Sequence, residues 1–222
     1  MASHPDKITE YFDSHAETYD EGGASVRWMG GEMLRVILRS HPIVSVHSML
    51  DLAAGTGNAT KVVEEFVRPR HITTVDGSQG MLDQLAEKYN HDPRISLVHR
   101  AVGAFVAESN KQHDLVVCVA GFPFMEDQLQ VITDTGRLVK PGGPFVFTYD
   151  SHVYFHSEQA ERTVSFPLGL AVYRQSPGEI DKAVQAGGLE VIENLQFIAR
   201  DKQEGERDPP ISGIVMAQKP KL

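Results

Sequence analysis

The stretch that decides the fold is MLDLAAGTGNAT, residues 49–60. It is typical of a short apolar strand that enters a glycine-rich turn and then a helix. Gly55 and Gly57 allow the backbone to turn tightly and to approach a ligand without an intervening Cβ, and N–H groups at a helix start point toward polar ligand groups. The segment therefore predicts a ligand site at the carboxyl end of a strand.

A carboxylate follows at the spacing that a nucleoside site needs. Asp76 ends the next predicted strand, where it can accept hydrogen bonds from both hydroxyls of a ribose, although Asp76 or Ser78 could also cap the following helix. Thr60 stands where a dinucleotide fingerprint has its third small residue. Asp51 would repel a pyrophosphate but could help to bind an ammonium group. A nucleoside that carries an amino acid is therefore favoured over a dinucleotide.

Strand-like and helix-like segments alternate around this turn. Strands are expected at residues 48–52, 71–75, 95–98, 115–120 and 144–149, with helices at 60–67, 78–89, 102–109 and 127–138. The alternation predicts a mostly parallel sheet with helices on both faces. A helix at 176–186 and two consecutive strands at 189–199 and 211–217 predict an antiparallel final hairpin.

The chain of 222 residues is expected to form a single domain. Two segments lie outside the alternating pattern. Residues 1–38 contain helical patterning, and residues 151–175 are too long for an ordinary connection between elements. We expect both segments to form a small cap over the site.

Charge and cysteine content exclude several classes of protein. The chain has 21 Lys and Arg against 30 Asp and Glu, and the net charge of −9 argues against nucleic acid or an anionic membrane as a partner. Cys118 is the only cysteine, which excludes an intrachain disulfide and a zinc site built on several thiolates. No signal peptide or membrane-spanning segment is recognised. We expect a cytoplasmic protein that is a monomer or a homodimer.

Five segments in order resemble the class I S-adenosylmethionine (SAM) dependent methyltransferases, in particular the small-molecule branch that includes ubiquinone and menaquinone methyltransferases. They are YFDSHAETYD at 11–20, LDLAAGTG at 50–57, VDGS at 75–78 with Met81 and Leu82, HDLVVC at 113–118 and GRLVKPGG at 136–143. The resemblance covers roughly residues 8–220. It implies a Rossmann-like α/β fold with a seven-stranded sheet, SAM as the cofactor and S-adenosylhomocysteine (SAH) as the product.

The resemblance also implies cofactor-binding residues around the turn. Asp51 would face the methionine part of SAM, Asp76 would bind the ribose, and Tyr19 would close over the cofactor from the N-terminal segment. The other expected contacts are the backbone of Ala53 and Gly55, Gly77 and Met81 beside the adenine, and Gly57, Ala101, Val102 and Val119.

One position departs from the pattern of the family. Relatives often have Gly-Asp-Ala after the third strand, with the Asp on the adenine amino group, whereas this chain has His99-Arg100-Ala101. An arginine side chain cannot accept a hydrogen bond from an amine. Either the backbone at Ala101 and Val102 holds the adenine alone, or another side chain replaces the missing Asp.

Methyl transfer from SAM depends mainly on alignment of the nucleophile and on the exclusion of water. A general base helps when the nucleophile is a hydroxyl, and His15, His152 and His156 in the cap segments are the candidates. The spacing of His152 and His156 could also suit a metal ion, but no third ligand is spaced to join them, and no metal is expected. Solvated histidines of a lid are the plainer alternative.

The apolar and aromatic content of the cap and of the loop after the fourth strand predicts a small, largely apolar or aromatic methyl acceptor. The expected substrate contacts are Trp28, Phe122, Phe124, Tyr154 and Tyr173. The same side chains could instead form a core of the cap or a dimer interface.

The predicted function is SAM-dependent transfer of a methyl group to an O, N or C nucleophile of such a metabolite. Three alternatives stay open. The first is a SAM-binding protein of the same fold that catalyses a cyclisation or elimination, or binds without turnover. The others are a protein or RNA methyltransferase and a nicotinamide-dependent reductase.

Overall fold

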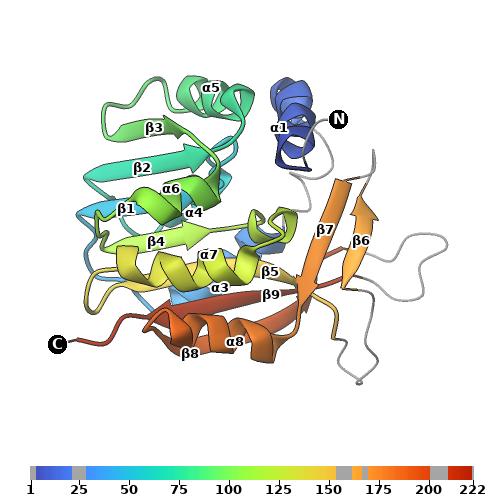
Figure 1. Ribbon diagram of the computed structural model, residues 1–222. Coiled ribbons are helices and arrows are strands. Elements are labelled where there is room, and N and C mark those ends of the chain that lie inside the picture. Colours follow the sequence, from blue (N-terminus) through green and yellow to red (C-terminus); the bar gives the residue numbers. More distant parts are fainter. Residues whose placement is uncertain (1–3, 22–28, 154–161, 167–169, 201–209, 222) are drawn as a thin grey trace.

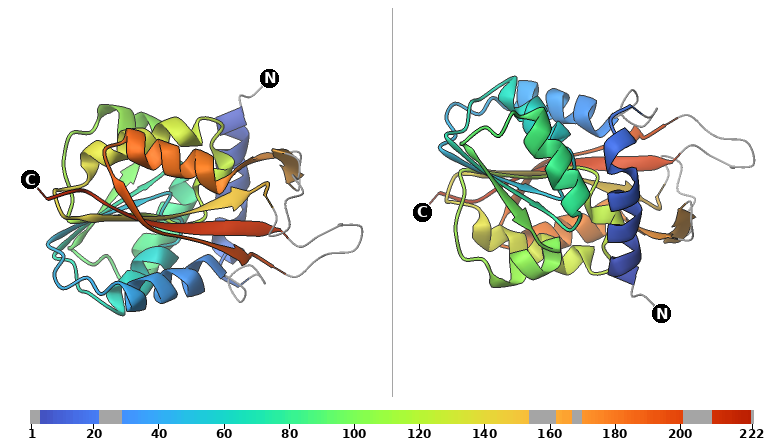
Figure 2. Two further views of the ribbon diagram at one scale, coloured as in Figure 1. Left: turned by 90° about the horizontal axis from the view of Figure 1, so that it is seen from below. Right: turned by 90° about the horizontal axis from the view of Figure 1, so that it is seen from above.

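The computed structural model describes residues 4–21, 29–153, 162–166, 170–200 and 210–221. Within these ranges one twisted sheet carries helices on both of its faces (Figures 1 and 2). Three of the predicted site residues, Trp28, Tyr154 and His156, lie outside the described residues. None of the described helices is both long enough and apolar enough to cross a membrane.

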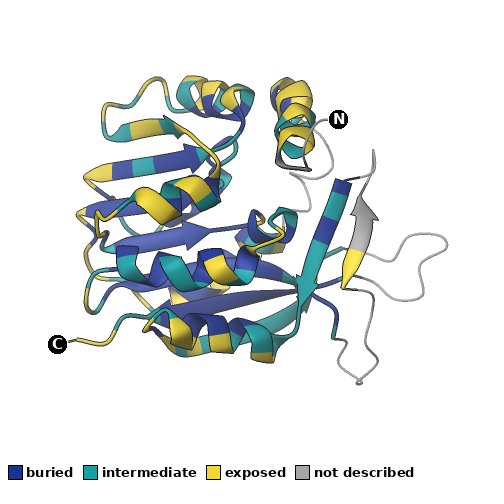
Figure 3. Ribbon diagram, in the orientation of Figure 1, coloured by how far each residue is buried: buried dark blue, intermediate teal, exposed yellow. Residues whose placement is uncertain are grey.

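The parallel half of the sheet confirms the predicted alternation. Its strands pair in the order β3-β2-β1-β4-β5, all parallel. Strands β1 and β4 are buried along their whole length, as expected for central strands covered on both faces (Figure 3). The bounds are Ser48–Leu52 for β1, His71–Asp76 for β2, Ile95–His99 for β3, Leu115–Cys118 for β4 and Pro144–Ser151 for β5.

Two apolar clusters hold the helices against opposite faces of this sheet. One cluster joins the sheet to α6, α7 and α8, and the other joins it to α3 and α4. Helix α5 packs against β2 and β3. The bounds are Met29–Ser40 for α3, Asn58–Glu64 for α4, Gln79–Lys88 for α5, Val102–Glu108 for α6, Gln128–Thr135 for α7 and Pro177–Ala186 for α8. Short 3₁₀ turns lie at Phe122–Phe124 (η2) and Gly136–Leu138 (η3).

The predicted antiparallel final hairpin is present. It consists of β8, Glu190–Ile198, and β9, Ile211–Gln218. Strand β9 pairs with β5 along the whole of β5, so the last strand of the chain inserts between β5 and β8. With the five parallel strands, these two complete the seven-stranded sheet that the resemblance implies.

The insertion after β5 contributes two further strands, which the sequence pattern did not predict. Strand β6, Thr163–Phe166, and strand β7, Leu170–Gln175, form an antiparallel pair. Strand β4 pairs with β5 only as far as Phe147, and β7 then pairs with β5 at Asp150 and Ser151. The insertion therefore extends the sheet at the carboxyl end of β5, beyond the point where β4 has ended.

The N-terminal segment forms α1, His4–His15, followed by the 3₁₀ turn η1, Ala16–Thr18. Helix α1 stands at the carboxyl ends of the parallel strands and contacts both α5 and β7 (Figure 1). The carboxyl edge of the sheet is thus flanked by both segments that the sequence predicts to form a cap.

Candidate cofactor and substrate site

A cavity of about 590 Å³ lies at the carboxyl ends of the parallel strands. Its walls come from α1 and Tyr19, from the turns after β1 and β2 with the first residues of α4 and α5, from the start of α6 and from the loop after β4. Nine of the eleven residues predicted for the cofactor lie on these walls: Tyr19, Ala53, Gly55, Asp76, Gly77, Met81, Ala101, Val102 and Val119.

The two glycines of the turn have different surroundings. Both adopt positive φ, 53° at Gly55 and 82° at Gly57. A Cβ added to Gly55 would have nothing within 4 Å, whereas one added to Gly57 would lie 2.8 Å from the ring of Tyr89 and 3.0 Å from Leu85. Gly55 lies on the cavity wall and Gly57 does not, because Gly57 packs against α5. The structure thus does not place Gly57 at the predicted cofactor contact.

Asp76 joins the turns after β1 and β2. Its Oδ2 accepts a hydrogen bond from the N–H of Gly55 at 2.8 Å, and its Oδ1 accepts one from the N–H of Ser78 at 2.8 Å. Burial raises the pKa of Asp76, and these backbone hydrogen bonds oppose that rise. The side chain that caps α5 is Ser78, which accepts from the N–H of Met81. Asp76 is therefore not required as a helix cap.

Asp51 lies in the interior and not on the cavity wall. Its side chain is fully buried, and its Oδ2 accepts a hydrogen bond from the hydroxyl of Thr60 at 2.6 Å. Its Oδ1 has no hydrogen-bond partner among the described residues. Burial, with a smaller contribution from the charge of Asp76, raises the pKa of Asp51 to about 7. Asp51 was predicted to contact the methionine part of SAM directly, but the structure does not place it on the cavity wall.

Two carboxylates fasten the N-terminal segment to the site. Asp13 accepts hydrogen bonds from the hydroxyl of Ser78 at 2.6 Å and from the N–H of Gly80 at 2.9 Å. Asp20 accepts from the side chains of Thr56 and Asn58, each at 2.9 Å, and pairs with the ammonium group of Lys88 at 2.5 Å. Helix α1 and η1 are therefore tied to the turn after β2, to the turn after β1 and to α5.

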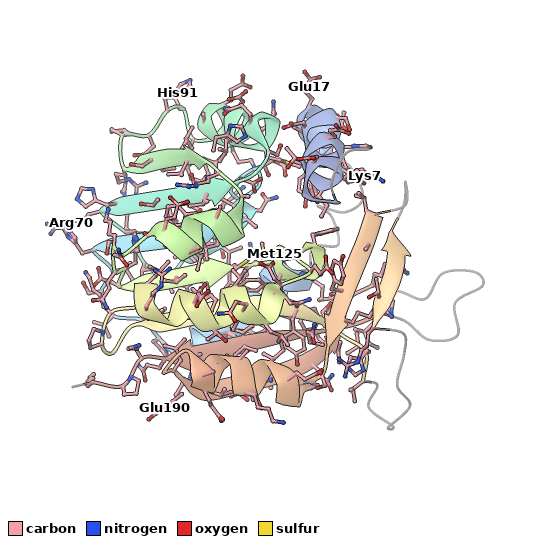
Figure 4. The ribbon with its side chains drawn as sticks, in the orientation of Figure 1. Lys7, Glu17, Arg70, His91, Met125 and Glu190 are labelled. Carbon is pink, nitrogen blue, oxygen red and sulfur yellow. The ribbon has the colours of Figure 1, made fainter. Side chains whose placement is uncertain are left out.

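The part of the cavity beneath α1 is apolar and aromatic. The ring of Phe12 meets Phe124 edge to face at 5.3 Å between centroids, and Tyr19 at 6.3 Å. Ile8 and Met125 complete this region, and Met125 is labelled in Figure 4. Burial first, and then the nearby acidic groups, raise the pKa of the Tyr19 phenol, so that Tyr19 stays protonated near neutral pH.

The charged residues on the described part of the wall are all acidic. They are Asp76, Glu126 and Asp127, and no Lys, Arg or His belongs to the described wall. Sequence reasoning did not identify Glu126 and Asp127, nor Ile8, Thr9 and Phe12 of α1, as site residues. The spacing of Ile8 and Phe12 on one helix face was an available signal for α1, whereas nothing in the sequence marks Asp127.

Two predicted substrate contacts lie away from the cavity. Phe122 is fully buried and packs against Phe145 and Phe147 in the core, so the structure places it in the core and not on the cavity wall. Tyr173 of β7 does not belong to the described wall, and its carbonyl accepts a hydrogen bond from Gln128. Phe124 does lie on the wall.

The described histidine candidates do not reach the cavity either. His15 is exposed, stacks on the ring of Tyr11 at 4.3 Å and has its Nδ1 2.8 Å from the carbonyl oxygen of Tyr11. His152 is buried, with its Nε2 3.4 Å from a carboxylate oxygen of Glu179 in α8. Neither residue belongs to the cavity wall. In the described ranges no three His, Cys, Asp or Glu side chains are grouped to hold a metal ion.

Comparison with known proteins agrees with this geometry. A family model described as a methyltransferase domain matches residues 49–143. Malonyl-[acyl-carrier protein] O-methyltransferase from Brevibacillus brevis is 24% identical over 213 residues, covering 90% of this chain and 75% of that protein. Demethylmenaquinone methyltransferase from Clavibacter sepedonicus is 25% identical over 147 residues, covering 66% of this chain and 59% of that protein.

Solved structures share the fold. The 1,6-didemethyltoxoflavin-N1-methyltransferase of Burkholderia thailandensis, solved with 1,6-didemethyltoxoflavin and SAH bound, superposes with a TM-score of 0.69. The superposition covers 100% of this chain and 92% of that chain, at 14% sequence identity. At this identity the likeness shows the fold alone.

The fold and the cavity define the class as a Rossmann-like α/β protein with its ligand site at the carboxyl ends of parallel strands. The family match and the relatives make the class specific. Residues 49–143 match a methyltransferase domain, and the chain is similar to methyltransferases named for malonyl-[acyl-carrier protein] and demethylmenaquinone. The protein is a SAM-dependent methyltransferase, and its cofactor is SAM.

Proposed function

We propose that the protein transfers a methyl group from SAM to an O, N or C nucleophile of a small, apolar or aromatic molecule that carries no negative charge. The observation that carries this proposal is the wall beneath α1. It combines the rings of Phe12, Tyr19 and Phe124 with the carboxylate of Glu126, and the described part of the wall contains no Lys, Arg or His. Such a wall favours a neutral or cationic acceptor and repels an anionic one.

The walls near the glycine turn suit SAM. Gly55 leaves open space where any other residue would place a Cβ, and the two carboxylate oxygens of Asp76 can accept hydrogen bonds from a ribose diol. Met81, Ala101 and Val102 offer apolar surface to the adenine. When bound, SAM supplies a methyl group on a sulfonium, and its transfer leaves the neutral thioether SAH.

The protein's own contribution would be alignment and exclusion of water. Helix α1 covers the cavity and is held there by Asp13 and Asp20. The titratable groups on the described wall are Tyr19, Asp76, Glu126 and Asp127, and Asp76 is assigned to the ribose. We infer that alignment of the acceptor with the methyl group contributes most to catalysis. We also infer that the segments at 1–38 and 151–175 form one domain with the sheet.

The relatives' names suggest two kinds of acceptor. A malonyl group carries a carboxylate, which the Glu126 carboxylate on the cavity wall would repel. A menaquinone precursor is a large apolar aromatic molecule and suits the aromatic wall better. We therefore propose an acceptor that resembles the menaquinone precursor more than the malonyl group.

Incubation with SAM that carries a labelled methyl group tests the proposal. Neutral and cationic aromatic amines and phenols, and a malonyl thioester, would be supplied in parallel, and the products identified by mass spectrometry. We expect label in an aromatic acceptor and none in the malonyl thioester. Label in the malonyl thioester alone would contradict the charge argument, and an unlabelled product would favour a cyclisation or elimination.

The two glycines of the turn should respond differently to substitution by alanine. We expect Gly55→Ala to cost only about 1 kcal/mol of folding free energy, because only its positive φ is unfavourable, but to weaken SAH binding roughly tenfold or more. Gly57→Ala, whose Cβ would clash with Tyr89, should destabilise the fold by about 2–4 kcal/mol. Denaturant unfolding and calorimetry with SAH measure both effects, and wild-type affinity in Gly55→Ala would refute the assignment.

A further inference from the structure

The arginine after β3 does not face the cavity. The guanidinium of Arg100 forms an ion pair with the carboxylate of Glu108, and the Arg100 side chain does not belong to the described wall. Its backbone N–H donates to the carbonyl oxygen of Asp76 at 2.8 Å. The position that departs from the family pattern therefore supplies no side-chain contact to a ligand.

A different carboxylate reaches the same end of the cavity. Asp127 lies on the wall, in the loop between β4 and α7. A Cβ placed on Gly103, in the first turn of α6, would lie 3.7 Å from Oδ2 of Asp127. The side chain of Asp127 thus crosses from the start of α7 to the start of α6, where Gly103 has no side chain to obstruct it.

The side chain of Asp127 is not used by its own helix. Asp127 occupies the N-cap position of α7 but makes no side-chain cap hydrogen bond. Within the described residues its carboxylate has no hydrogen-bond or ion-pair partner. A wall carboxylate that is not engaged in the fold is available to a bound molecule.

The ribose site proposed at Asp76 and the wall residues after β3 indicate how a nucleoside would lie in the cavity. Asp76 is assigned to the ribose, and Met81, Ala101 and Val102 belong to the part of the wall that is assigned to the base. Gly103 follows Val102 on the wall, and Asp127 lies beside Gly103. A base held at Ala101 and Val102 would therefore lie close to the Asp127 carboxylate.

We propose that Asp127 accepts a hydrogen bond from the exocyclic amino group of adenine and so selects a 6-amino purine over a 6-oxo purine. This inference rests on the proposed function, because it takes SAM as the molecule in the cavity. The amino group is a donor and suits a carboxylate, whereas a 6-oxo group is an acceptor and would be repelled. Asp127 is then a specificity-determining residue at a position that the family pattern does not supply.

The neighbouring Glu126 is the natural control. It also lies on the wall, but its charge acts on the phenol of Tyr173 in β7, where burial and then Glu126 raise the pKa of that phenol. Its carboxylate is thus associated with the side of the cavity near β7. Asp134, which accepts a hydrogen bond from Gln130 on α7, controls for loss of one negative charge outside the wall.

The test is calorimetric titration with SAH and with S-inosylhomocysteine, which differs in having a 6-oxo group in place of the 6-amino group. We expect the wild type to prefer SAH by roughly tenfold or more. Asp127→Ala should bind SAH more weakly and lose the preference. Asp127→Asn, whose amide can also donate, should bind the 6-oxo ligand as well as SAH or better. Glu126→Gln and Asp134→Asn should keep the wild-type preference.

The outcomes separate this inference from the proposed function. If the wild type does not bind SAH, the proposed function and the inference both fall. If the wild type binds SAH but does not distinguish it from S-inosylhomocysteine, or if both Asp127 variants keep the preference, the inference alone falls. Thermal unfolding of each variant verifies that the exposed position tolerates the change without loss of the fold.

Discussion

Replacement of Asp76 by alanine is expected to weaken SAH binding by roughly 100-fold or more, because two charge-assisted hydrogen bonds to the ribose would be lost. The carboxylate also accepts the N–H groups of Gly55 and Ser78, each at 2.8 Å. Its removal would therefore loosen the two turns that form the walls on either side of the ribose. Both effects act in the same direction on affinity.

Calorimetry with SAH measures the loss, and Asp76→Asn separates its two components. The amide keeps one acceptor oxygen and nearly the same volume, so it should preserve more of the turn structure than alanine while still binding weakly. Asp83→Ala is the matched control, because Asp83 lies on α5 with its carboxylate hydrogen-bonded to Gln79 and does not belong to the cavity wall. Full affinity in Asp76→Ala would remove the ribose assignment.

The fold could be predicted from the sequence because its signals are local. The strands from β1 to β5 are short apolar runs separated by helical periodicity, and the capping box at Ser176 and Glu179 marks the start of α8. The β6–β7 pair was not predicted, because its place in the sheet depends on where β4 ends. That end leaves Asp150 and Ser151 of β5 free to pair with β7.

The site could be predicted where the functional residue stands in the turn that directly follows a strand or at the end of that strand. Gly55 and Asp76 follow directly from the ends of β1 and β2, and both lie on the cavity wall. Phe122 and Phe124 show the limit of this reasoning, since both belong to the 3₁₀ turn η2. With three residues per turn, side chains two apart point in different directions, and only Phe124 reaches the cavity. The position of Asp127 on the cavity wall depends on the packing of α7 against α6, and no local sequence pattern predicts that packing.

The largest expected effect on stability concerns Asp51. Its folded-state pKa is raised from 3.8 to about 7, mainly by burial, so between these values the folded protein retains a proton that the unfolded chain releases. Stability contributed by this group is therefore complete below about pH 4 and is lost progressively as the pH rises to about 7. At about 1.4 kcal/mol per unit, the loss amounts to about 4 kcal/mol.

Asp51→Asn should abolish that loss, because asparagine has no proton to release and can still accept the hydrogen bond that Thr60 now donates to Asp51. We expect the variant without cofactor to be more stable than the wild type at about pH 8, and the difference to shrink or reverse at about pH 5. Urea unfolding of both proteins across this range measures the effect, and Asp83→Asn on exposed α5 serves as the control. Parallel stability curves for wild type and Asp51→Asn would show that Asp51 is ionised in the fold throughout.

The same variant tests why a buried carboxylate persists beneath the glycine turn although its Oδ1 has no hydrogen-bond partner within the described ranges. A cationic group bound in the cavity would favour the ionised form, so the wild type should bind SAM more tightly as the pH rises through about 7. Asp51→Asn should bind SAM with little dependence on pH and more weakly than the wild type at about pH 8. Greater stability together with weaker binding would identify Asp51 as a group kept for the ligand at the expense of the fold, whereas unchanged binding would assign it to the core alone.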